Sequence, residues 1–275
     1  MHDKISVSGL CFPEFDLADT LAAVTELGIS ASTLQTDVIR QDGWQKGLAQ
    51  IRSSGISVPG LVGPFPKDLG NRESWSAART DFIETLDAAA ELGSRAVYSV
   101  TGPLVTDERQ ESLDLFVEFI APVVAYAKEV GVLLCVEPTI PDYSWVSFVF
   151  TLDEVVELYE LTGMGVCLDL YHVWNDPKLE YFLTHHLDLI GLVQVGDCVM
   201  QDGHAVKVVT GEGIIPLPNV LAQVVASGYD GVFDIEQFGP RMEDEGLIPS
   251  ARRAVFNVEK AFVPGAARLT NRAFR

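Results

Sequence analysis

Residues 165–197, GVCLDLYHVWNDPKLEYFLTHHLDLIGLVQVGD, predict a strand, a helix and a second strand. The first strand is expected over Gly165–Leu168, the helix over Leu179–Leu187 and the second strand over Leu192–Val195. Both predicted strands are short and almost wholly apolar, which is typical of parallel strands buried on both faces. The stretch therefore predicts a βαβ unit.

The same alternation of a short apolar run and a longer helical run repeats along the chain. Eight strands are predicted, over Ile5–Cys11, Ile29–Leu34, Ile56–Val62, Ala96–Val100, Val132–Val136, Gly165–Leu168, Leu192–Val195 and Val232–Ile235. The helices expected after them cover Asp19–Leu27, Gln45–Ser53, Ser74–Leu92, Glu108–Val130, Leu152–Leu161, Leu179–Leu187, Leu217–Ser227 and Ser250–Phe262. Eight such units in about 250 residues predict an α/β fold, a (β/α)8 TIM barrel. Residues 1–275 are expected to form one domain; the alternative, an open doubly wound sheet, lacks a GxGxxG after the first strand.

The composition excludes several classes of partner. The chain has 19 Lys and Arg against 39 Asp and Glu, a formal net charge of −20. This charge argues against binding to nucleic acid or to an anionic membrane surface. Four cysteines occur without a CxxC pair, which favours reduced core thiols. The N-terminal residues Met-His-Asp-Lys lack the pattern of a signal peptide, so we expect a cytoplasmic protein.

Oxygen-bearing side chains occur at the ends of four successive predicted strands. Glu137 follows VLLCV, Asp169 follows GVCL, Gln194 lies within LVQV and Glu236 follows VFDI. In a TIM barrel the carboxyl ends of the strands meet at one rim, so these side chains are expected to converge. Three converging carboxylates repel one another unless a cation binds them. Carboxylate and amide oxygens suit Mg²⁺ or Mn²⁺.

Other residues near this rim are candidates for contacts with a substrate. His172 comes three residues after Asp169 and is expected to face the same cavity. Aromatic side chains such as Trp174 are candidates to wall a polyol pocket. The segments 138–150 and 197–213 are expected to be loops that act as lids. Lys207 and Arg241 are expected to be surface cations, with binding of an anionic group as the alternative.

The candidate residues resemble a known family in their order along the chain. Glu137, Asp169-x-x-His172, Gln194-x-x-Asp197, Gly211-Glu-Gly213 and Glu236 resemble the xylose isomerase-like TIM barrel superfamily of sugar phosphate isomerases/epimerases and hydroxypyruvate isomerase-like proteins. The resemblance implies that Glu137, Asp169, Gln194 and Glu236 hold one divalent metal ion, Mn²⁺ or Mg²⁺ with Co²⁺ as a further candidate. It also implies that Glu137 and Glu236 form the acid/base pair and that His172 contacts a substrate oxygen. Asp197 and Trp174 are expected in the substrate pocket with His172.

The function that the resemblance implies is an enzyme of carbohydrate metabolism. We expect a metal-dependent isomerase or epimerase that acts on a small polyhydroxy ketone or aldehyde by proton transfer through an enediolate. The alternative is a metal-dependent lyase or dehydratase acting on a cyclic polyol ketone, inosose- or dehydroshikimate-like, or on an oxidised glycoside. Thr139 stands where dehydroshikimate dehydratases of this superfamily carry His, which disfavours that substrate. Endonuclease IV activity is disfavoured by the charge, and the resemblance allows a homo-oligomer.

Overall fold

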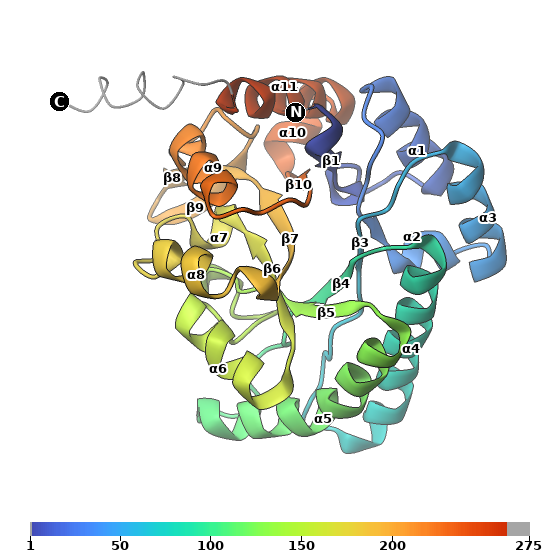
Figure 1. The fold of residues 1–275 in the computed structure, drawn as a ribbon, viewed down its shortest axis with the longest axis vertical. Coiled ribbons are helices and arrows are strands. Elements are labelled where there is room, and N and C mark those ends of the chain that lie inside the picture. The colour runs from blue at the N-terminus through green and yellow to red at the C-terminus, as the bar shows by residue number, and fades with distance from the viewer. Residues whose placement is uncertain (1, 263–275) are drawn as a thin grey trace.

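Eight parallel strands form a closed ring in the computed structural model, which describes residues 2–262 (Figure 1). The strands are β1 (Ile5–Val7), β2 (Leu34–Gln35), β3 (Gly60–Val62), β4 (Ala96–Ser99), β5 (Leu133–Val136), β6 (Gly165–Asp169), β7 (Ile190–Val195) and β10 (Phe233–Ile235). Their order is β1-β10-β7-β6-β5-β4-β3-β2. The ring closes where the Val7 N–H donates to the Ala31 carbonyl and the Gly9 N–H donates to the Thr33 carbonyl, at 3.2 and 2.8 Å. The TIM barrel prediction is therefore confirmed.

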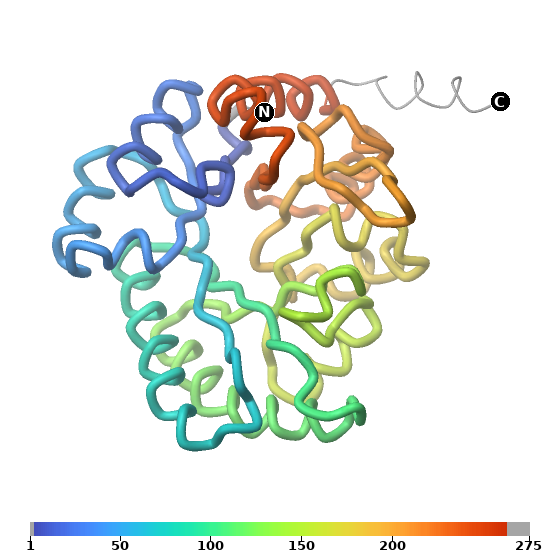
Figure 2. The backbone as a smooth tube through the Cα atoms, turned by 180° about the vertical axis from the view of Figure 1, so that it is seen from behind, coloured from blue at the N-terminus to red at the C-terminus, as the bar shows by residue number. Residues whose placement is uncertain are grey.

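Helices surround the strands on the outside of the ring (Figures 1 and 2). The longer ones are α1 (Leu17–Glu26), α3 (Trp44–Ser54), α4 (Trp75–Leu92), α5 (Arg109–Val130), α6 (Leu152–Thr162), α8 (Leu179–His185), α9 (Leu217–Ala226) and α11 (Leu247–Ala261). Three short helices lie in connections: α2 (Thr36–Arg40), α7 (Leu170–Val173) and α10 (Pro240–Glu245). A two-stranded antiparallel hairpin, β8 (Asp197–Gln201) with β9 (His204–Val208), follows β7. None of the helices within residues 2–262 is both long enough and apolar enough to cross a membrane.

Local signals explain where several of these helices begin and end. Thr151 caps α6 through a capping box, in which its hydroxyl accepts from the Glu154 N–H and the Glu154 carboxylate accepts from the Thr151 N–H. Gly93 follows α4 and Gly131 follows α5 in the left-handed conformation, at φ 70° and 75°, which costs glycine little. These caps set the points at which the chain turns back to the next strand.

The inside of the barrel changes from apolar to polar along its axis. Ala96, Tyr98, Cys135, Cys167 and Leu192 form a small buried cluster separate from the main core between strands and helices. Side chains alternate along a strand, so on β6 and β7 the next residues with the same orientation as Cys167 and Leu192 are Asp169 and Gln194. The polar residues thus lie towards the carboxyl ends of the strands, above the apolar cluster.

Four expected segments differ clearly from the structure. The predicted strand Ile56–Val62 reduces to β3, Gly60–Val62. The predicted strand Ile5–Cys11 ends at Val7, because the Ser8 side chain accepts from the Leu10 N–H and starts a 3-10 turn. The predicted strand Ile29–Leu34 reduces to Leu34–Gln35 and one bridge between Ala31 and Ser57. The segment 197–213, expected to be a loop, contains the β8–β9 hairpin.

Candidate active site

Four strands bring the predicted metal-ligand candidates to one end of the barrel. Asp169, the last residue of β6, lies opposite Gln194 of β7 in the sheet register. Glu137 follows β5 and Glu236 follows β10, and each donates its backbone N–H to the neighbouring strand, to Ser99 and Val195. Asp169, Gln194 and Glu236 are buried, and the Glu137 side chain is 12% exposed. The rim predicted from the strand ends therefore exists.

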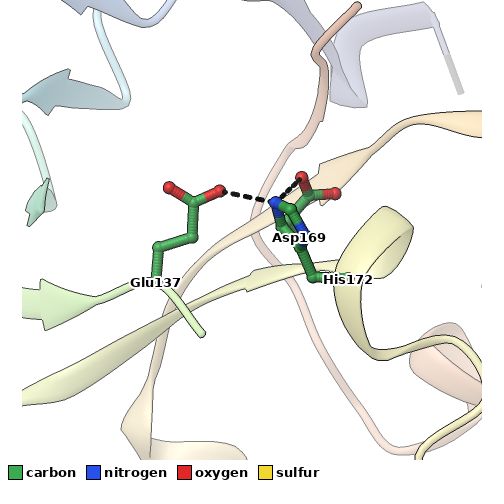
Figure 3. Close-up of side chains that lie close together, drawn as sticks. All are labelled: Glu137, Asp169 and His172. Carbon is green, nitrogen blue, oxygen red and sulfur yellow. Dashed lines mark ion pairs between the residues drawn. The ribbon is translucent and has the colours of Figure 1, made fainter. Parts of the chain in front are cut away.

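One half of the site consists of Glu137, Asp169 and His172 (Figure 3). His172 Nε2 lies 3.7 Å from Glu137 Oε1 and 3.6 Å from Asp169 Oδ2. Asp169 also caps helix α7, because its Oδ1 accepts from the Tyr171 N–H at 2.8 Å. This cap starts a helical turn that returns His172, three residues later, over the carboxylate. Asp169 Oδ2 is left buried without a hydrogen-bond donor.

A backbone hydrogen bond assigns the tautomer of His172. The Ile140 N–H donates to His172 Nδ1 at 3.1 Å, so Nδ1 is the acceptor nitrogen. Burial, aided by the Lys207 charge, lowers the pKa of His172 well below its ordinary value of 6.5, so the ring is neutral near pH 7. A neutral imidazole that accepts at Nδ1 carries its proton on Nε2. The group facing Glu137 and Asp169 is therefore an N–H donor, suited to a substrate oxygen rather than to a metal ion.

The other half of the site is built on Glu236. Its Oε1 pairs with Lys207 Nζ at 3.1 Å. Its Oε2 accepts from Gln194 Nε2, and the Tyr98 hydroxyl lies 3.4 Å from it. Gln194 Oε1 instead faces Cys167 Sγ at 3.0 Å. Gln194 thus presents nitrogen to Glu236 in this arrangement, and its amide must turn over to offer oxygen to a cation there.

A fourth carboxylate, Asp234, lies deeper in the barrel, two residues before Glu236. It accepts from Ser6 Oγ at 2.6 Å, from Thr33 Oγ1 at 2.7 Å and from Gln194 Nε2 at 3.3 Å. Burial raises its pKa from 3.8 to about 7. Asp234 therefore supports the Gln194 amide from below.

The electrostatics of the site favour a cation. Burial raises the pKa of Glu137 well above 4.5, and the Glu236 and Asp169 charges raise it further. Burial likewise raises the pKa of Asp169 to about 7. Both shifts disfavour the ionised carboxylates, and a bound divalent ion would reverse them. Asp169 Oδ2 accepts no hydrogen bond from the residues that the structure describes. Together with the surrounding carboxylate and amide oxygens, it is a suitable ligand for a hard divalent ion.

The fold and this site agree with a comparison against known families. Residues 21–257 match the family model described as xylose isomerase-like TIM barrel. The chain belongs to the xylose isomerase-like TIM barrel family. The resemblance inferred from the strand-end residues is thereby confirmed.

Three known proteins are similar to this chain. A putative hydroxypyruvate isomerase of Streptomyces coelicolor is 26% identical over 270 residues, which cover 89% of this chain and 95% of that protein. A crystal structure from Sinorhizobium meliloti 1021 has a TM-score of 0.84 at 25% identity and covers 95% of this chain and 99% of its own. The IolI protein, crystallised with a bound zinc atom, has a TM-score of 0.78 at 19% identity, covering 95% and 99% of the two chains. At that identity the last likeness shows the fold alone.

Asp197 has a structural task that its family-like position did not predict. Its Oδ1 accepts from the backbone N–H groups of Cys198 and Ile215, and its Oδ2 accepts from those of Gly211 and Gly213, at 2.8 to 3.1 Å. The carboxylate thus joins the start of the hairpin to the GEG segment after it. Contact with substrate by Asp197 remains a prediction.

Trp174, the other residue predicted for the substrate pocket, follows helix α7 directly. It is half-buried and packs against the main hydrophobic core. Its contact with substrate also remains a prediction.

Lys207 is the functional candidate that sequence reasoning placed wrongly. It was expected at the surface, yet its side chain is 4% exposed and paired with Glu236. The signal was present in the alternation of DCVMQ and HAVKV around an Asp-Gly turn, which is a strong hairpin pattern. In that hairpin Lys207 lies opposite the buried Cys198. Arg241, by contrast, is exposed as expected and pairs with Glu245.

Proposed function

We propose that this chain is a divalent-metal-dependent isomerase or epimerase acting on a small polyhydroxy ketone or aldehyde. The observation that carries the proposal is the pair of glutamates, Glu137 and Glu236, at the ends of β5 and β10 beside Asp169 and its undonated carboxylate oxygen. Two carboxylates at one site can remove a proton from a substrate carbon and return it. The family membership and the hydroxypyruvate isomerase relative support the same class of reaction.

The metal would be held by Glu137, Asp169, Gln194 and Glu236. Their oxygens favour Mn²⁺ or Mg²⁺, with Co²⁺ as a further candidate. When bound, the ion would polarise the carbonyl group of the substrate and so acidify the neighbouring C–H bond. Gln194 would contribute Oε1 after its amide turns; Nε2 would then face Cys167 Sγ, and the Tyr98 hydroxyl, which now accepts from Nε2, could donate to Oε1.

The chain's own residues then carry the proton. One of the two glutamates removes the proton next to the carbonyl group. His172 donates its Nε2–H to the substrate oxygen on which negative charge develops. Returning the proton to the neighbouring carbon gives isomerisation, and returning it to the opposite face of the same carbon gives epimerisation. Loss of a neighbouring hydroxyl group instead would give the lyase alternative.

The experiment replaces Glu236 by Gln and follows a panel of ketoses and hydroxypyruvate in D₂O with Mn²⁺. Wild-type protein is expected to incorporate deuterium next to the carbonyl carbon of at least one substrate, and Glu236→Gln is expected to lose this exchange while staying folded. Exposed Glu160 provides the control, because Glu160→Gln removes a charge near the C-terminal end of α6, which leads into the start of β6 and not into its carboxyl end. Exchange that survives in Glu236→Gln would refute the two-glutamate scheme. Net loss of water would move the assignment to a lyase.

A further inference from the structure

Lys207 is an unusual cation in this molecule. Among the residues that the structure describes, it is the only Lys or Arg that is buried. Its Nζ lies 3.1 Å from Glu236 Oε1, 4.2 Å from the centre of the Phe238 ring and 4.7 Å from that of Tyr171. Aromatic faces and one carboxylate together stabilise an ammonium group that has been removed from water.

The fold holds Lys207 in this place. Lys207 lies on β9, which pairs with β8. Strand β8 begins at Asp197, with one residue between it and the end of β7 at Val195. The turn of the hairpin has Asp202 at φ 52° and Gly203 at φ 87°, as a tight turn of this kind needs. The Asp197 carboxylate then binds the backbone on both sides of the hairpin, at Cys198 and at Gly211 to Ile215. The position of Lys207 is therefore set by the hairpin and its base.

The carboxylate oxygens of the site therefore differ in whether they already accept a hydrogen bond. Both oxygens of Glu236 already have donors, Lys207 on one and Gln194 on the other. Asp169 Oδ2, in contrast, has none. An ion entering beside Asp169 therefore competes with Lys207 and Gln194 for the oxygens of Glu236. It also meets the repulsion of the ammonium charge, which is screened less inside a protein than in water.

We propose that Lys207 is a built-in counter-cation that holds Glu236 in the metal-free site and lowers the affinity of the site for a divalent ion. Entry of the ion separates Lys207 Nζ from Glu236 Oε1. Lys207 is thus a positioning residue for Glu236 and makes metal binding readily reversible. This inference rests on the metal site of the proposed function.

The test compares Mn²⁺ binding by wild type and variants through titration calorimetry at one fixed pH, about 8. Lys207→Met is expected to bind Mn²⁺ about tenfold more tightly than wild type, or better, because one positive charge near the ion is gone. Lys207→Arg retains the charge and is expected to stay within a few-fold of wild type. Lys46→Met changes an exposed lysine paired with Asp42 and is expected to leave the affinity unchanged.

Two results separate failure of this inference from failure of the proposed function. Wild type that binds Mn²⁺, with Lys207→Met binding no more tightly, would overturn the role of Lys207 alone. Wild type that binds no divalent ion would overturn both. Should Lys207→Met not fold, crystal structures of wild type with and without Mn²⁺ decide the matter. The Lys207–Glu236 pair is expected to be broken in the loaded form, and an intact pair there would overturn the inference.

Discussion

At the scale of single residues, the site depends on hydrogen bonds that fix which atoms can donate. The Ile140 N–H holds Nδ1 of His172 as an acceptor and so leaves a proton on Nε2. Distance alone groups His172 with Glu137 and Asp169 as candidates to hold an ion. The tautomer separates them, because a nitrogen that carries a proton cannot coordinate a cation. We therefore propose that His172 donates to the substrate and does not bind the ion.

Replacing His172 by Asn tests this assignment. Turnover is expected to fall about 100-fold or more, the usual range for loss of a proton-carrying group, while Mn²⁺ affinity stays within a few-fold. Activity assays and calorimetry on the same preparation give both values. His185→Asn is the matched control, because His185 is exposed on α8 and bonds only locally to Tyr181. Loss of Mn²⁺ binding in His172→Asn would make His172 a metal ligand instead.

Asp234 predicts a pH dependence of stability. Its pKa rises from 3.8 to about 7 on folding because of burial, so the folded protein binds the proton more tightly than the unfolded chain. The stabilisation from this proton is complete below pH 3.8 and is lost as the pH rises through about 7. The metal-free protein should therefore melt at a lower temperature at high pH than at mildly acid pH. Asp234→Asn should flatten that dependence, as thermal melts across this range would record; an unchanged slope would contradict the buried, titrating carboxyl group.

At the scale of elements, the sequence predicts the strands best where they are buried on both faces. The predicted strands Val132–Val136 and Gly165–Leu168 match β5 and β6 to within one residue at each end. Short uninterrupted apolar runs are typical of parallel strands that are buried on both faces. Helix α7 escaped prediction because its four residues are too few to show a helical period. Its start depends on the Asp169 cap, and the sequence pattern indicated a metal ligand at this position, not a helix cap.

The residues at the strand ends were predictable because a barrel brings its carboxyl ends together. Their partners were not. The Lys207–Glu236 pair joins residues 29 positions apart through a hairpin insertion, and Ser6–Asp234 joins residues 228 apart around the closed ring. No periodic pattern in the sequence indicates either pairing. Both follow only once the hairpin and the closure of the ring are known.

The base of the hairpin offers a test of how firmly Lys207 is placed. A methyl group on Gly213 would overlap the Asp197 carboxylate and the Cys198 carbonyl oxygen, both of which lie at the base of the hairpin. Gly213→Ala is expected to cost about 2 kcal/mol or more of unfolding free energy, since it breaks buried hydrogen bonds, and to reduce turnover as well. Denaturant unfolding and activity assays measure the two effects.

Gly203 at the tip of the same hairpin is the control. It lies at φ 87° with no neighbouring atom in reach of a methyl group, so Gly203→Ala should cost only about 1–2 kcal/mol of backbone strain. Turnover should stay close to wild type. Equal losses of activity in both variants would mean that the base of the hairpin has no special part in the site.

At the scale of the whole molecule, the fold gathers carboxyl groups at one end of the barrel, where a divalent ion could bind them. Many basic side chains pair with acids at the surface, as Arg72 does with Glu118 and Arg253 with Glu212. Four carboxylates, Glu137, Asp169, Asp234 and Glu236, meet inside one end of the barrel with Lys207 as their buried ammonium partner. An ion that binds the folded protein and not the unfolded chain stabilises the fold by mass action. The site should therefore be detectable through stability as well as through chemistry.

The most direct test of the central claim is the metal content of protein purified without chelator. Elemental analysis is paired with thermal melts before and after Mn²⁺ or Mg²⁺ is added, on wild type, Glu137→Gln and Asp169→Asn. The account predicts about one divalent ion per chain, with a higher melting temperature when loaded, and loss of both effects in the two variants. Wild type with no bound metal and no stabilisation by any divalent ion would contradict the metal-dependent mechanism.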